Sequence, residues 1–180
     1  GAKYTDPSYD GHHTKWGVTL PTLQEFRKNT KLGASDIKAL TEEDALEIFV
    51  VKYWNLVRCD ELPAGLDLLM ADFAYNKGVG ACKEVLQRAL GFTGDDVDGD
   101  FGPKTMKALL KMPFKEFQTK FYVAKLAYYE TRQNQAKFIK GWKNRMNDAR
   151  DVATALHSEV MANVDIIVAD TLIASVEPTN

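Results

Sequence analysis

The segment that most restricts the fold is residues 62–78, LPAGLDLLMADFAYNKG, because it is apolar on almost every side. If this segment is helical, it has little polar face to present to water, so other elements must cover it. Pro63 suits the first turn of a helix and Gly78 suits its C-terminal stop. We therefore predict a central helix here, around which the rest of the chain packs.

Helical signals precede this segment as well, which indicates a mainly α protein. Thr19 stands before a segment with Pro21 in its first turn, and Thr41 opens a capping box. Apolar residues at helical spacing follow that capping box, and we expect most of them in the core: Leu46, Phe49, Val50, Tyr53, Trp54 and Val57. Residues 31–36 are expected as a connector, and residues 4–18 have room for a short hairpin.

The C-terminal half alternates predicted helices with one aspartate-rich loop. The helices are predicted at residues 84–90, 104–111 and 114–132, with a last long one from residue 136 past His157 that Gly141 could interrupt. Residues 93–103, TGDDVDGDFGP, are the strongest loop signal in the chain, and if an EF-hand calcium loop began at Asp96, then Asp98 and Asp100 would fill its third and fifth positions. However, Phe101 stands where that loop needs glycine, and Lys107 stands where its bidentate Glu belongs. We therefore expect a turn that caps a helix beginning at Pro103.

The composition is that of a globular protein. The 180 residues are 45% hydrophobic and 27% charged, which is enough for one domain with a small appendage. The formal net charge of −2 argues against a dedicated nucleic-acid-binding protein. The longest apolar run, residues 165–174, is broken by Asp170 and Thr171, so no membrane span is predicted. Residues 1–4 lead into no apolar secretory signal, and the missing initiator Met leads us to expect further sequence before Gly1.

No metal site and no cofactor are predicted from the histidines and cysteines. His12 and His13 are adjacent, and adjacent side chains point in different directions in most backbones. We expect loop histidines, one of which can touch a ligand. Cys59 and Cys82 match no metal-binding spacing, and we expect two buried thiols.

Three polar residues on the central helix are candidates for a site. Asp72 and Asn76 lie four residues apart and share a helix face, which Tyr75 borders. Burying an uncompensated carboxylate is costly. Two interpretations are open: the pair belongs to a structural hydrogen-bond network, or it faces a cleft.

The tryptophans are candidates for either the core or sugar-binding platforms. Trp54 lies among core residues, whereas Trp142 lies near Arg145 and could brace the wall of a cleft. Trp16 lies in a polar stretch with Asp and His, where an exposed indole suits carbohydrate recognition.

Several motifs, in order along the chain, resemble glycoside hydrolase family 108, which comprises phage-type endolysins and bacterial secretion-activating proteins. The matching N-terminal motifs are Asp6-Pro7, Asp10-Gly11 and Thr14-Lys15-Trp16-Gly17-Val18-Thr19. Residues 62–65 and 72–78 are similar to the family's central helix, residues 97–105 to its peptidoglycan-binding-like second half, and residues 141–145 to its C-terminal Gly-Trp motif. The resemblance covers about residues 1–151.

The resemblance implies a lysozyme-like helical domain with a short polar hairpin or loop region at the N-terminus. It implies a catalytic part at residues 1–91, a peptidoglycan-binding-like part at residues 92–151, and a C-terminal helix or tail of unassigned role at residues 152–180. The implied activity is that of an N-acetylmuramidase, which cleaves peptidoglycan glycan strands in the periplasm or cell wall. A holin or an upstream signal would deliver such an enzyme.

The implied chemistry is general acid and base hydrolysis of a glycosidic bond. The family's catalytic Glu opens a Glu-Gly-Gly-Tyr motif, and its position falls just before Gly1, so we expect it upstream of this sequence. Asp10, with Asp6 as the alternative, would be the second carboxylate, and Thr14 would orient a water. The expected substrate-binding residues are Tyr9, His13, Trp16, Asp72, Tyr75 and Asn76.

Three other functions are open from the sequence. A lytic transglycosylase would use the same Glu without a second carboxylate. A peptidoglycan-binding or secretion-accessory protein would bind the wall and release nothing. A helical domain with an unrelated role ranks last, because the motifs follow the order of the family.

Overall fold

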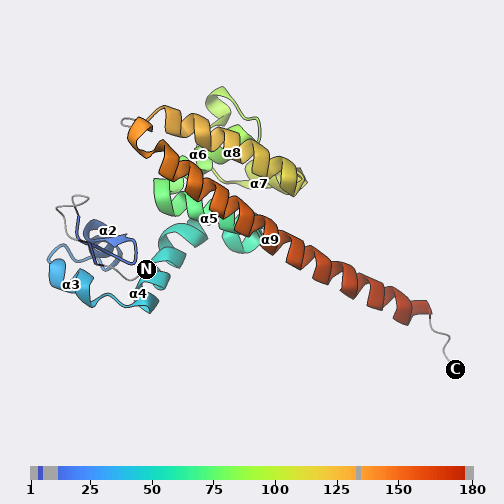
Figure 1. The fold of residues 1–180 in the computed structure, drawn as a ribbon, viewed down its shortest axis with the longest axis horizontal. Helices are drawn as coiled ribbons and strands as arrows, with labels where there is room; N and C mark the ends of the chain where they lie inside the picture. Colours follow the sequence, from blue (N-terminus) through green and yellow to red (C-terminus); the bar gives the residue numbers. More distant parts are fainter. Residues whose placement is uncertain (1–3, 6–11, 133–134, 177–180) are drawn as a thin grey trace. The chain divides into compact units, whose positions relative to one another are not determined.

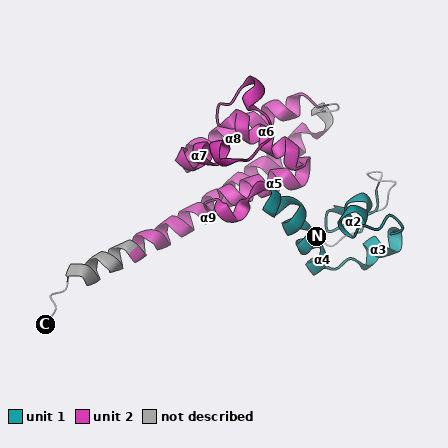
Figure 2. Ribbon diagram, turned by 180° about the vertical axis from the view of Figure 1, so that it is seen from behind, with its two compact units in different colours: residues 1–56 teal, residues 57–180 magenta. Residues whose placement is uncertain are grey.

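The computed structural model describes residues 4–5, 12–132 and 135–176, and for residues 135–137, 166 and 168–176 only the backbone. The chain forms two compact units, residues 1–56 and residues 57–180, and each is described by itself (Figure 2). The prediction of a mainly α fold is confirmed. From the sequence we expect three functional parts, with boundaries at residues 91 and 151. These parts are not the same as the two compact units, and they stay a prediction.

In its described residues, the first unit holds a short hairpin followed by helices (Figure 1). Its elements are β1 (Thr14–Lys15), β2 (Val18–Thr19), α2 (Leu20–Phe26), α3 (Ala34–Ala39), α4 (Glu42–Phe49), the π-helical turn η1 (Val50–Trp54) and the start of the 3-10 turn η2 (Asn55–Val57). Thr19 caps α2, and Thr41 caps α4 in a capping box with Asp44, as the sequence predicts. The expected connector at residues 31–36 instead leads into α3, where the Asp36 carboxylate accepts a hydrogen bond from the Gly33 amide at 2.8 Å.

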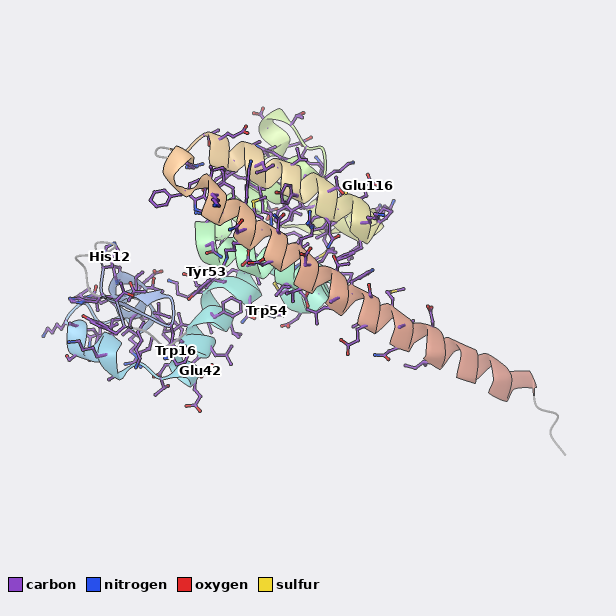
Figure 3. All side chains as sticks on the ribbon, in the orientation of Figure 1. His12, Trp16, Glu42, Tyr53, Trp54 and Glu116 are labelled. Atoms are coloured by element: carbon purple, nitrogen blue, oxygen red, sulfur yellow. The ribbon has the colours of Figure 1, made fainter. Side chains whose placement is uncertain are left out.

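The core of this unit lies on a different face of α4 from the one predicted. Its buried residues are Val18, Leu23, Ile37, Leu40, Ala45 and Ile48. Leu46, expected in the core, is 60% exposed. Phe49 is half-buried, and its ring centroid lies 6.3 Å from those of Tyr53 and Trp54, which Figure 3 labels on η1. Helix α4 therefore turns Ala45 and Ile48 toward the core, and each of these residues precedes by one position a residue that was predicted there.

The second unit is helical among its described residues, with the predicted central helix inside it. Its elements are η3 (Cys59–Glu61), α5 (Leu66–Lys77), α6 (Val79–Ala89), η4 (Gly94–Asp96), α7 (Pro103–Lys111), α8 (Phe114–Glu130) and α9 (Gln135–Val176). The central helix α5 packs against α6 and α9, and α8 packs against the same two helices (Figure 1). The long helix α9 continues through Gly141 without a break.

Helix α5 begins at Leu66, later than the sequence predicts, because of the backbone at Gly65. Gly65 has φ +91°, a left-handed conformation that favours glycine. A Cβ at Gly65 would lie 2.5 Å from the carbonyl oxygen of Ala153, on α9. Glycine therefore allows the start of α5 and the middle of α9 to approach closely.

The aspartate-rich loop is held by Gln87, a buried side chain of α6. Gln87 Nε2 donates to Asp98 Oδ1 at 2.6 Å and to the Asp100 carbonyl at 3.0 Å, while its Oε1 accepts from the Gly99 amide at 2.8 Å. The hydrogen bond from Gln87 is the largest cause that lowers the pKa of Asp98, followed by the hydrogen bond that the Asp100 amide donates to Asp98 Oδ1 at 2.8 Å. Helix α7 then begins at Pro103, as predicted. The Asp98 carboxylate therefore helps to hold the loop by accepting the hydrogen bond from Gln87.

Cys59 and Cys82 are buried free thiols, as expected. Burial raises the pKa of Cys59 to about 12, so its thiol stays protonated at neutral pH. Among the described residues, no group of three or more His, Cys, Asp or Glu side chains could hold a metal ion. No helix in the described part of the chain has the length and apolar character needed to cross a membrane.

Candidate functional site

The N-terminal motif Thr14–Thr19 folds as a tight hairpin. Thr14 pairs with Thr19 and Lys15 with Val18 in antiparallel register. The turn between the strands is formed by Trp16 and Gly17, which both have positive φ, 55° and 78°. Two successive residues of this kind match the twist of a two-residue hairpin.

A third stretch of chain is attached to this hairpin at Thr5. The Thr5 amide donates to the Thr14 carbonyl at 2.7 Å, and the Thr14 amide donates to the Thr5 carbonyl at 3.0 Å. Thr5 immediately precedes Asp6 in the sequence, and Thr14 follows Asp10 by four positions. The backbone on either side of the two candidate carboxylates is therefore held together.

Around this bridge lies a small cluster of aromatic and cationic side chains. Tyr4 Oη and His13 Nδ1 share a hydrogen bond of 2.5 Å, and their rings stack with centroids 5.9 Å apart. Lys38 Nζ lies 4.9 Å from the centroid of the Tyr4 ring, and Lys15 Nζ donates to the Lys38 carbonyl at 2.7 Å. Sequence reasoning chose His13 but missed Tyr4 and Lys38, which lie far apart along the chain.

Of the other predicted site residues in the first unit, some lie outside the described residues and the rest lie on the hairpin. Asp6, Tyr9 and Asp10 lie outside the described residues, so their roles stay predictions. Thr14 is half-buried, and its hydroxyl donates to the His12 carbonyl at 3.3 Å. Trp16 is half-buried and packs against the core of the first unit (Figure 3). Part of the indole is therefore structural, and its contact with a sugar stays a prediction.

In the second unit, Asp72 forms an ion pair that reaches across to α9. Its Oδ1 accepts from Arg145 Nε at 2.8 Å and lies 2.7 Å from Arg145 Nη2. Asn76 Nδ2 donates to the Asp72 carbonyl at 2.6 Å. The first of the two interpretations, a hydrogen-bond network, therefore describes Asp72.

The second interpretation, a cleft, also has support at Asp72. A shallow cavity of about 250 Å³ is lined by Leu68, Asp72, Arg145, Asp148, Ala149 and Val152. The Asp72 side chain is 14% exposed, so it borders this cavity from a largely buried position. Tyr75 is half-buried and Asn76 is exposed. The Asp72–Arg145 pair is thus both a structural tie and the polar edge of a cavity.

Next to this pair, a cation lies on two stacked aromatic rings. Tyr129 and Trp142 stack with centroids 4.4 Å apart, and Lys77 Nζ lies 5.0 Å and 4.5 Å from them, respectively. Burial lowers the pKa of Lys77, and Arg132 and Arg145 lower it further. The stack of Lys77, Tyr129 and Trp142 joins the C-terminal end of α5 to α8 and α9. Sequence reasoning singled out Trp142 but missed Lys77.

A second cation, Lys125, is buried in the core of this unit. It is 2% exposed, and its Nζ lies 4.9 Å from the Phe121 ring centroid and 5.8 Å from that of Phe73. Burial lowers the pKa of Lys125 to about 8, although the nearby Asp72 carboxylate opposes that shift. Sequence analysis missed this residue, yet a signal was available, because the buried residues of α8 recur every four positions: Phe117, Phe121, Lys125 and Tyr129.

The described candidate residues thus fall into two groups. Thr14, His13 and Trp16 belong to the first unit, whereas Asp72, Tyr75 and Asn76 belong to the second.

Comparison with known proteins gives two family matches. Residues 1–78 match the family described as "Glycosyl hydrolase 108", and residues 82–147 match the one described as "Predicted Peptidoglycan domain". The first match ends at Gly78, between α5 and α6, and the second begins at Cys82, inside α6. No curated protein matches the chain.

A solved structure of SagA from Brucella abortus resembles the chain in both sequence and fold. The two are 35% identical, and the match covers 86% of this chain and 87% of that chain, with a TM-score of 0.77. The similarity therefore extends over most of both chains.

Proposed function

The chain belongs to the glycosyl hydrolase 108 family, and from this premise we propose that it hydrolyses the glycan strands of peptidoglycan. The observation that carries the proposal is the match of one chain to both a glycosyl hydrolase and a peptidoglycan domain. A glycosyl hydrolase joined to a peptidoglycan domain has peptidoglycan as its natural substrate.

The proposed reaction is lysozyme-type cleavage by two carboxyl groups. The general acid is a Glu expected immediately before Gly1, which protonates the leaving oxygen of the glycosidic bond. The second carboxylate is Asp10, with Asp6 as the alternative, and it activates water or stabilises the positive charge of the transition state. Thr14 orients the water.

The hairpin supports these assignments through its rigidity. Thr14 is fixed by backbone hydrogen bonds to Thr5 and by its pairing with Thr19. A group that orients water must be held in place by its surroundings, since small displacements reduce catalysis steeply. Within the proposal, His13 and Trp16 bind the sugar beside this hairpin together with Tyr9, while Asp72, Tyr75 and Asn76 bind the strand from the second unit.

The proposal includes the place of action, which is the cell wall or periplasm. Delivery there by a holin or by an upstream signal belongs to the same proposal.

The experiment that tests the proposal compares the lysis of purified cell walls by the protein that includes the residues preceding Gly1 and by its Asp10→Asn variant. We expect Asp10→Asn to reduce lysis by orders of magnitude without changing the thermal unfolding midpoint. Asp95→Asn, which removes an exposed carboxylate from the loop before α7, is the matched control and should leave lysis unchanged. Near-normal lysis by Asp10→Asn would remove Asp10 from the mechanism.

A further inference from the structure

The second unit contains a larger groove that the proposed glycosidase chemistry does not use. It has a volume of about 630 Å³ and lies between α6 and α8, which run side by side in Figure 1 and Figure 2. This volume is in the range of pockets that hold small ligands. Small and aliphatic side chains line much of it: Val85 and Ala89 from α6, and Val123, Ala124 and Ala127 from α8. Val123 is 60% exposed, so an apolar side chain is available to a ligand.

Cationic side chains surround this apolar lining. Arg88 pairs with Glu84 at 3.2 Å, and Lys120 pairs with Glu116 at 2.8 Å. The third cation is Arg132, which lines the groove just beyond the C-terminal end of α8. Among the described residues, no carboxylate lies within ion-pairing distance of Arg132. The groove therefore offers one guanidinium with unused capacity for an anion.

The guanidinium of Arg132 is held in place by an aromatic ring. Its Cζ lies 4.0 Å from the centroid of the Tyr128 ring, a cation–π contact that restricts the long side chain. Because less conformational freedom is lost when a restrained guanidinium binds, such an arginine suits the recognition of a carboxylate.

The chemistry of the groove favours a peptide over a sugar. Among the described residues that line it, Tyr128 is the one aromatic ring, and the Arg132 guanidinium lies over that ring, so these residues offer a sugar face no open platform. The neutral polar side chains that line it are two threonines, Thr119 and Thr131, and the phenol of Tyr128, which are few for the many hydroxyls of a glycan. A ligand with methyl side chains and free carboxylates fits both the apolar lining and the cation.

We propose that the groove between α6 and α8 binds the peptide stem of peptidoglycan, with the alanine methyl groups on the apolar lining and a stem carboxylate on Arg132. The inference rests on the proposed function, because peptidoglycan is the substrate that brings such a peptide to this chain. The match to a peptidoglycan domain over residues 82–147 contains all of α8 and all of α6 except its first three residues. The groove thus selects the peptide, whereas cleavage acts on the glycan.

The test measures binding by calorimetry, using the full chain and three probes. They are a synthetic stem pentapeptide with free carboxylates, the same peptide with its carboxylates amidated, and a peptide-free chitin oligosaccharide. Arg132→Gln removes the charge, and Ala127→Phe fills the groove from an exposed position on α8. Lys107→Gln, which removes an exposed charge from α7 outside the groove, is the matched control. Circular dichroism of each variant checks that the fold is kept.

We expect the free peptide to bind and the amidated peptide to bind about 10-fold more weakly or worse, since a charge-assisted contact is lost. Arg132→Gln should weaken binding of the free peptide by a similar factor, Ala127→Phe should abolish it, and Lys107→Gln should leave it unchanged. Absence of peptide binding, equal binding of both peptides, or binding that neither groove variant affects would overturn the inference. So would oligosaccharide binding that Ala127→Phe blocks.

The two proposals fail separately, because peptide binding requires no cleavage. Peptide binding without release of glycan from cell walls would overturn the proposed function alone. Cell-wall hydrolysis by a protein whose groove ignores the peptide would overturn this inference alone.

Discussion

Asp72 on α5 and Arg145 on α9 form an ion pair, with Oδ1 2.7 Å from Nη2 and 2.8 Å from Nε. Seventy-three residues separate them in the sequence, so the pair fixes a long-range contact between the central helix and the C-terminal helix. The Asp72 side chain is 14% exposed and that of Arg145 is 52% exposed. Water therefore screens Arg145, whereas the Asp72 carboxylate takes its shortest side-chain hydrogen bond from Arg145 and a longer one, at 3.5 Å, from Asn76.

Arg145→Gln should lower the free energy of unfolding by about 1–2 kcal/mol, because it leaves the Asp72 carboxylate largely buried without its cation. Denaturant unfolding measures this change. Lys143→Gln, which removes an exposed charge from the same helix, should change the free energy by less than about 0.5 kcal/mol. Equal effects of the two substitutions would show that the pair contributes nothing to stability.

Gly65→Ala should lower the free energy of unfolding by at least about 2 kcal/mol, because the new Cβ meets backbone and the φ of +91° is strained for alanine. The atom in its way is the Ala153 carbonyl oxygen, 2.5 Å from the Cβ position. Gly80→Ala is the matched control: Gly80 lies inside α6 with nothing within 4 Å of its Cβ position, so alanine there should be neutral or stabilising. A thermal melt of both variants is sufficient, and a Gly65→Ala protein as stable as Gly80→Ala would contradict the close approach of α5 and α9.

Lys125→Met should make the protein more stable at neutral pH, and the gain should shrink as the pH rises above about 8. The folded-state pKa of Lys125 lies below its ordinary value of 10.5, so between these values the unfolded chain holds the proton that the folded protein has lost. The contribution of Lys125 to stability therefore rises with pH across this window, by about 3 kcal/mol.

The measurement is the difference in unfolding free energy between Lys125→Met and wild type at a series of pH values. Burial also raises the pKa of Cys59 to about 12 and that of Cys82 as well, which lowers stability above pH 9. That loss occurs in both proteins and largely cancels in the difference. A difference that is constant from pH 7 to pH 10.5 would contradict a buried lysine that titrates near pH 8.

Gln87→Leu should loosen the aspartate-rich loop and lower the free energy of unfolding by about 1–3 kcal/mol, since buried hydrogen bonds are lost. The same substitution should raise the pKa of Asp98, because the Gln87 hydrogen bond is the largest cause of its low value. An aspartate whose pKa is lower in the folded protein than in the unfolded chain stabilises the fold at pH values above its unfolded-state pKa. That stabilisation is lost as the pH falls through its folded-state pKa. NMR titration of Asp98 in both proteins checks the shift, and an unchanged pKa would show that Gln87 does not hold the loop.

Local signals in the sequence predicted most of the helices. The capping box at Thr41, Pro21 in the first turn of α2 and Gly78 at the end of α5 act on neighbouring residues, so they can be recognised without a structure. Helix α3 was missed because its cap is a glycine and its length is only six residues. The core face of α4 was misplaced because tertiary packing chose the small Ala45 over Leu46.

The candidate site was predicted less fully, because its contacts connect distant parts of the chain. Sequence reasoning chose Asp72 and Asn76 but could not supply Arg145, since no local pattern links residues so far apart. It also missed Lys125, where a cation occupies a position that helical spacing assigns to the core. The family resemblance supplied the roles of Asp10 and Thr14, which composition and periodicity do not define.

The most direct test of the proposed function is mass spectrometry of the muropeptides that the protein releases from purified peptidoglycan, with the residues that precede Gly1 present. We expect soluble muropeptides that end in a hydrolysed muramic acid, one water heavier than the anhydro form. Anhydro ends would contradict hydrolysis and indicate a lytic transglycosylase, and peptidoglycan that is bound without any released fragment would contradict a glycosidase altogether.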